Sequence, residues 1–187
     1  WEEGTWVRGI DEERTRKMED PIISGVVHDV GEAKMTLLGV PDRPGVSALL
    51  FESLADANVN VDMIVQNTSI DGTTDISFTL PLGDIATALP ILKKVGDEVG
   101  AKGVSQDENI VKLSLVGAGM KSSPGIAAKM FRVLADNDVN IEMISTSTIR
   151  ISVVVERSKL ETAIRALHTA FDLDSGQDYS APLPERK

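Results

Sequence analysis

The chain has 187 residues, of which 42% are apolar, and this length accommodates one large hydrophobic core or two small ones. With 19 basic and 29 acidic residues the formal net charge is −10, and no run of Lys and Arg forms the basic stripe that nucleic acids or anionic membranes attract. Because cysteine, a membrane-length apolar run and a signal-peptide core are all absent from the sequence, we expect a soluble cytoplasmic protein without nucleic-acid or membrane partners.

The first 20 residues hold both tryptophans, Trp1 and Trp6, followed by a run of charged residues. This pattern is typical of the end of one domain and a linker, so we expect residues 1–20 to be a leader made of the trailing edge of some other domain plus a linker. The apolar segment 22–29 then predicts a strand that precedes the first repeat.

Two long segments of the chain repeat one another. Residues 44–64 and 124–144 are identical at eleven positions with a constant offset of 80, which indicates duplication of one structural unit. In each copy a short apolar strand, at 34–40 or 112–117, leads to a Pro-Gly turn and then to apolar residues at helical spacing. Each helix is expected to bury this apolar stripe against a sheet.

The remaining elements follow the same order in both copies. Alternating residues predict a second strand at 59–66 and at 139–146, and a hairpin leads into a third strand before a second amphipathic helix. These third strands and second helices are expected at 73–80 and 149–155, and at 83–99 and 158–172. The β-α-β-β-α-β order predicts an α+β fold of two ferredoxin-like modules, each an antiparallel four-stranded sheet with two helices.

The second module is one strand short of this plan. The first module can close with a strand at 102–106, whereas residues 174–187 offer only a polar tail, which we expect to be disordered. We therefore predict that segment 22–29 completes the second sheet, so that the first module is inserted into the second. The alternative is that 22–29 adds a fifth strand to the first sheet. The predicted bounds are 32–107 for module 1 and 21–31 plus 108–173 for module 2.

The Pro-Gly turns carry a possible binding chemistry. A helix start presents amide N–H groups without intrahelical partners and a partial positive charge, which suits a carboxylate. No acidic side chain follows Gly45 or Gly125 in the first turn, and Asp42, Asp62 and Gln66 could accept hydrogen bonds from an amino group. These groups suit a free amino acid. The structural alternative is that Pro-Gly and Asp serve only as turn and cap residues.

Catalytic or metal chemistry is not indicated. Residues 116–120, VGAGM, begin like a dinucleotide fingerprint, but Ser122 stands where its third glycine would be. His28 and His168 are isolated in the sequence, and no nucleophile is paired with a base. We therefore predict no catalytic residue and no metal site in this chain.

Taken together, these motifs resemble a known family. A strand ending in Gly, a Pro-Gly helix start and the string LADxxVNxxMI resemble the ACT domain, a regulatory module that binds amino acids. The strings VPDRPGVSALLF, DGTTDISFT and KLSLVGAGMKSSPG resemble the regulatory half of bacterial aspartate kinase. The resemblance implies either an excised regulatory region or a β subunit made from an internal start near Met18. ATP and magnesium are then expected only in the kinase domain, so we expect no cofactor in this chain.

Family members phosphorylate aspartate at the first step of lysine, threonine and methionine biosynthesis, and the first module of one chain pairs with the second module of another. The resemblance implies a homodimer attached to a catalytic subunit or domain, with feedback inhibition by threonine at one site and by lysine at a second. The first implied site consists of Asp42, Arg43, Pro44, Gly45, Val46, Ser47, Asp62 and Gln66, with Asn140 and Ile141 of a partner module. The second consists of Met120, Lys121, Ser122, Gly125, Ile126 and Glu142, with Asn60 and Val61.

Two other functions stay open at this point. The chain could be a constitutive assembly module that joins subunits by sheet-edge pairing. It could also be the ACT pair of another enzyme of amino-acid metabolism. The string GTWV in the leader resembles the end of the aspartate kinase catalytic domain, which favours the regulatory hypothesis over this last one.

Overall fold

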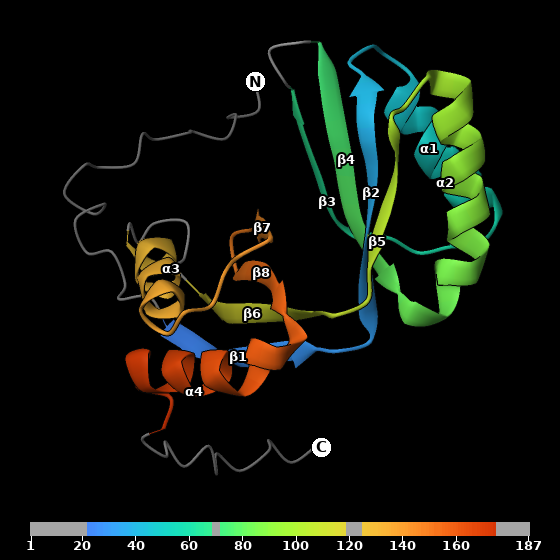
Figure 1. The fold of residues 1–187 in the computed structure, drawn as a ribbon. Helices are drawn as coiled ribbons and strands as arrows, with labels where there is room; N and C mark the ends of the chain where they lie inside the picture. Colours follow the sequence, from blue (N-terminus) through green and yellow to red (C-terminus); the bar gives the residue numbers. More distant parts are fainter. Residues whose placement is uncertain (1–21, 69–71, 119–124, 175–187) are drawn as a thin grey trace, which may run out of the picture.

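The computed structural model describes residues 22–68, 72–118 and 125–174, and these form two antiparallel four-stranded sheets with helices on one face of each (Figure 1). The predicted leader, and the predicted tail beyond its first residue, lie outside the described residues. In chain order the elements are β1 Ile22–Asp29, β2 Glu32–Pro41, α1 Val46–Asp56, β3 Asp62–Thr68, β4 Thr73–Pro81, the short 3-10 helix η2 Leu82–Asp84, α2 Ile85–Val99, β5 Gly103–Asp107, β6 Ile110–Ala118, α3 Ile126–Asp136, β7 Met143–Thr146, β8 Arg150–Glu156, η3 Arg157–Lys159 and α4 Leu160–Ala170.

Strand β1 is an edge strand of the second sheet. That sheet has the order β1-β6-β8-β7, with Val26 opposite Leu115 in the antiparallel pair of β1 and β6, and the first sheet has the order β3-β4-β2-β5. Figure 1 shows β1 alongside β6, although the whole first module separates them in the chain. The first module is therefore inserted into the second, as the strand count predicts, and the fifth-strand alternative is wrong.

Each module folds around its own apolar core. The predicted stripes are confirmed, because one face of α1 and of α3 is buried against its sheet. These buried residues are Val46, Leu50 and Leu54 in α1 and Ile126, Met130 and Leu134 in α3. Phe78 of β4 is completely buried and meets Phe51 edge to ring, with 5.4 Å between the ring centroids. Burial of each such side chain stabilises the fold by about 1.5 to 3 kcal/mol, so two separate cores sustain two modules.

The second strand of each module begins later than the alternating pattern predicts. β3 starts at Asp62 and not at residue 59, because α1 ends in a turn that occupies the intervening residues. In that turn Asn58 has a φ of 57°, and the amide of Val59 donates to the carbonyl of Leu54 at 3.0 Å. Val59 is buried as part of this helix exit, as is common after a helix end, and only resembles the first inward residue of a strand. Residues 137–142 repeat the arrangement before β7.

A third, smaller apolar cluster joins the two modules. It consists of Met63 from β3, Ile110 from β6, Met143 from β7 and Val154 from β8, all of which are buried. All of its described members come from strands, so the sheets meet through the faces that their helices leave uncovered. Figure 1 shows the strands of one sheet running across those of the other at this junction.

Candidate functional site

The loop before α1 carries most of the first implied site. Gly45 has a φ of 96°, a conformation that glycine adopts without strain, and its carbonyl accepts from the amide of Leu49 as the helix begins. The loop is held in place because the amide of Asp42 donates to the carbonyl of Gly72 at 2.9 Å. Asp42, Arg43 and Pro44 are exposed, so their side chains are accessible from solvent.

The first turn of α1 is open to an anion. The helix has no side-chain cap and no acidic residue in its first turn, and nothing lies within 4 Å of the space beside Gly45 that a Cβ would fill. Ser47 donates its hydroxyl to the side-chain oxygen of Gln66 at 2.8 Å, which places this glutamine of β3 beside the helix start. Buried Val46 packs beneath the same turn. Unpaired helix-start amides with an open approach suit a carboxylate.

Asp62 lies on the opposite face of the sheet from Gln66. β3 has one more residue than β4 between Asp62 and Val65, which is a β-bulge. At the bulge Met63 has a φ of 44°, and its amide donates to the Asp62 carboxylate at 2.8 Å. An extra residue changes which side chains share a face, so Asp62 and Gln66 diverge although their spacing is even. The structure thus brings Ser47 and Gln66 together and holds Asp62 apart from them.

Asp62 and Glu142 each form an ion pair with the other module. Lys112 of β6 donates to Asp62 Oδ2 at 2.9 Å and also pairs with the buried carboxylate of Glu32. Lys34 of β2 pairs in turn with Glu142, which immediately precedes β7. Lys34 and Lys112 each begin the matching strings KMTLLG and KLSLVG, and Asp62 and Glu142 match at the offset of 80, so the same kind of ion pair forms in both directions between the modules.

The charges of this cluster reinforce one another. The hydrogen bond from Lys112 holds the pKa of Asp62 below its usual range, while partial burial acts in the opposite direction. Burial by itself would lower the pKa of Lys112, but the hydrogen bonds to Asp62 and Glu32 outweigh it and raise that pKa. Both shifts favour the charged forms at neutral pH, so the modules are joined by ions and not by neutral hydrogen bonds.

The second implied site falls partly on described residues. Met120, Lys121 and Ser122 lie outside them. Gly125 has a φ of 107°, like Gly45, and α3 also begins without a side-chain cap above its buried Ile126. Ala127 stands where α1 has Ser47, so this helix start lacks the hydroxyl that reaches the neighbouring strand. The two helix starts therefore share a backbone but differ in their side chains.

The residues expected from the partner module occupy the helix exits. Asn60 and Val61 precede β3, and Asn140 and Ile141 precede β7, with both asparagines exposed. Within the part of the chain that the structure describes, no hydrogen bond joins these asparagines to a helix-start loop. The hydrogen bonds of the described residues therefore join the first implied site only as far as Ser47 and Gln66.

Glu32, Lys34 and Lys112 are functional candidates that the sequence patterns did not indicate. The signal for Lys34 and Lys112 is that a lysine opens the predicted apolar strand of both repeats, whereas Glu32 has no charged counterpart because Ile110 stands at the matching position. Among residues 22–68, 72–118 and 125–174, no group of His, Cys, Asp or Glu is arranged to hold a metal ion. In the same part of the chain, every helix is too short or too polar to cross a membrane.

Comparison with known proteins identifies the family. The ACT-domain family matches residues 36–95 and 113–171, one stretch in each module. The aspartokinase of Pseudomonas aeruginosa is 51% identical over 172 residues, which are 92% of this chain and 41% of that protein. The solved regulatory subunit of aspartate kinase from Thermus thermophilus, in a ligand-free form, is 39% identical with a TM-score of 0.76, over 80% of this chain and 98% of that one. This chain belongs to the aspartate kinase family, as a regulatory region with two ACT domains.

Other relatives agree with this assignment. The aspartokinase of Corynebacterium glutamicum is 49% identical over 163 residues, which are 86% of this chain and 38% of that protein. A crystal structure of aspartokinase alpha and beta subunits includes a chain that is 46% identical with a TM-score of 0.76, over 81% of this chain and 99% of that one. The regulatory region described here spans about two fifths of the length of the curated relatives it matches. The predicted family and the ferredoxin-like fold of both modules are confirmed.

Proposed function

We propose that this regulatory region confers feedback inhibition on an aspartate kinase, with threonine bound at the first site and lysine at the second. The observation that supports it most is the start of α1, where uncapped amides, the open approach at Gly45 and the Ser47–Gln66 pair lie together. A ligand carboxylate would accept from the α1 amides, while Gln66 and Asp42 hold its polar groups. Asn140 and Ile141 of a partner module would close the site in a homodimer.

Linkage supplies the mechanism. A ligand held between two chains binds only the arrangement in which both walls are present, so it shifts the population toward that arrangement. A coupling of about 1 to 3 kcal/mol changes an equilibrium roughly 5- to 150-fold, which suffices for feedback control of a catalytic subunit or domain.

The test is calorimetric titration of the chain with threonine and with lysine. Ser47→Ala and Gln66→Ala should each weaken threonine binding up to about tenfold, because each removes one polar contact worth roughly 0.5 to 1.5 kcal/mol. Thr162→Ala, an exposed change on α4, is the matched control and should leave the affinity unchanged. If the wild-type chain shows neither heat nor a thermal shift at millimolar threonine, the first site does not bind it.

One observation favours a second candidate, a constitutive assembly module. Ile64 and Ile144 are 51% and 43% exposed on β3 and β7, which are edge strands of their sheets. An apolar edge strand is a ready template for pairing with another chain. Sedimentation velocity with and without threonine separates the two functions. A dimer that threonine tightens supports feedback regulation, whereas an equally tight dimer in both conditions supports assembly alone.

A further inference from the structure

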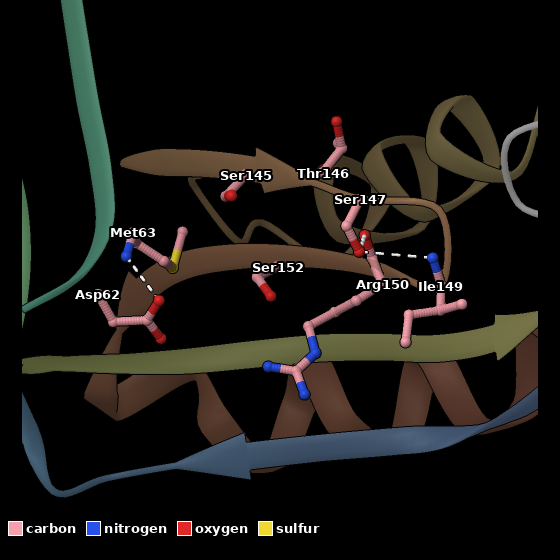
Figure 2. Close-up of a pocket in the computed structure, with 8 residues that line it drawn as sticks. All are labelled: Asp62, Met63, Ser145, Thr146, Ser147, Ile149, Arg150 and Ser152. Atoms are coloured by element: carbon pink, nitrogen blue, oxygen red, sulfur yellow. Dashed lines mark hydrogen bonds between the residues drawn. The ribbon is translucent and has the colours of Figure 1, made fainter.

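A pocket of about 250 Å³ lies between the two modules, on the helix-free side of β7 and β8 (Figure 2). Asp62 and Met63 of the first module form one wall, and the β7–β8 hairpin of the second module forms the other. The helix-start loops lie across the sheets from this pocket, since Gln66 contacts Ser47 on the helical face. Of the residues assigned above to effector sites, Asp62 alone lines it.

Arg150 of β8 provides the positive end of the pocket. Among the described residues its guanidinium has no hydrogen-bond or ion-pair partner, although its side chain extends toward Ser152 in Figure 2. The pKa of Asp62 is lowered mainly by its hydrogen bond from Lys112, and the charge of Arg150 lowers it further. The charges at the two ends of the pocket therefore attract one another. A planar guanidinium with free donors matches a carboxylate in a two-pronged contact.

The opposite end of the pocket is negative, and hydroxyl groups lie between the ends. Asp62 accepts from Lys112 and from the amide of Met63, and its side chain is still 59% exposed, so its carboxylate has room for another donor. Figure 2 shows Ser152 between Asp62 and Arg150, with its pairing partner Ser145 on the neighbouring strand β7. Hydroxyls both donate and accept, so Ser145 can bind either end of a dipolar molecule, and Ser152, which already shares a hydrogen bond with Ser114 at 2.8 Å, keeps further bonding capacity.

We propose that this pocket binds a small zwitterionic amino carboxylate, with its carboxylate on Arg150 and its ammonium between Asp62 and the serine hydroxyls. The separation of charge disfavours a simple anion, which Asp62 would repel, and a simple cation, which Arg150 would repel. The volume is below the roughly 300 to 1,000 Å³ of sites for drug-sized ligands, which limits the occupant to a single small metabolite.

The site has a structural consequence. Its walls belong to different modules, so an occupant binds only when the modules hold their present arrangement, and it stabilises that arrangement. The ligand would act together with the ion pairs of Lys112 and Lys34, which join the same two modules. This inference does not depend on effector binding at the helix starts, because the two kinds of site lie on opposite faces of the sheets.

The test is an NMR titration of the isotope-labelled chain with glycine as the probe, and with acetate and methylamine as its two half-molecules. Glycine should shift the amide signals of Ser145 and Ser152 and bind at least about tenfold more tightly than either half-molecule, because it gains a second charged hydrogen bond. Arg150→Gln should remove most of this binding. Arg132→Gln, on the exposed face of α3, is the matched control and should leave it intact.

Each contrary outcome is distinct. Arg150 is exposed, so Arg150→Gln should keep the wild-type melting temperature, and undiminished glycine binding by this folded variant overturns the proposal. Acetate that binds as tightly as glycine overturns it too, as does the absence of shifts at Ser145 and Ser152 at high millimolar glycine. Ser47→Ala should leave these shifts unchanged. The helix-start site and the pocket can therefore fail independently of one another.

Discussion

Replacing Lys112 by methionine removes the cation that joins β6 of the second module to two carboxylates of the first. Methionine keeps an unbranched apolar stem, so the change isolates the charge. Lys112 and Glu32 are only 8% and 9% exposed, and one carboxylate oxygen of Glu32 already lacks a hydrogen-bond partner among the described residues. Without Lys112, Glu32 is a buried and uncompensated charge.

The expected cost is large. Breaking a buried ion pair from one side destabilises a protein by about 3 to 5 kcal/mol, and we expect Lys112→Met to fall in that range because of Glu32. Asp62 should contribute little, since its side chain is 59% exposed and water can replace the lost donor. The double variant Lys112→Met with Glu32→Leu removes both buried charges, so it should recover most of the lost stability.

The free energy of unfolding, measured by urea denaturation, tests this reasoning. Lys159→Met is the matched control, because its ammonium also lies 2.9 Å from a carboxylate, that of Asp138, but at the surface. The control should cost less than about 1 kcal/mol. Equal losses for Lys112→Met and Lys159→Met would refute the argument from burial. A double variant no more stable than Lys112→Met would refute the role of Glu32.

Three further predictions concern the core, the ion pair and the helix start. Phe78→Ala should cost about 3 to 5 kcal/mol in urea unfolding, because the ring is completely buried. The pKa of Asp62 is lowered in the folded state, so its ion pair stabilises the fold above about pH 4 and this stabilisation is lost as the pH falls. The difference in melting temperature between wild type and Asp62→Asn should therefore shrink toward acid, and a difference that persists well below about pH 4 contradicts the assignment. Gly45→Ala should destabilise by about 1 kcal/mol or more, since a φ of 96° strains an L-residue even where space is open; unchanged unfolding would show that the turn relaxes.

Much of the fold follows from local patterns in the sequence. The spacing of Leu50 and Leu54, and of Met130 and Leu134, predicts the buried faces of α1 and α3 because helical periodicity depends only on near neighbours. The insertion of one module in the other is also predictable, because a sheet one strand short must take its missing edge from an unassigned apolar segment. The start of β3 could not be predicted from local patterns. Val59 is apolar and buried, and it would be so whether it belonged to a strand or to a helix end.

Some features of the candidate site can likewise be predicted from the sequence, and others cannot. Its glycines and the uncapped start of α1 are visible in the sequence, because turn chemistry is local. The face on which Asp62 lies is not, because a bulge inserts one residue without any change in composition.

The repeat by itself determined the two modules, their helices and their Pro-Gly loops. Tertiary structure decided how the modules meet. Lys112 and Asp62 are 50 residues apart and Lys34 and Glu142 are 108 apart, and no periodicity connects positions at such separations. Their pairing depends on two sheets packing through their helix-free faces, and that packing also creates the pocket between Asp62 and Arg150.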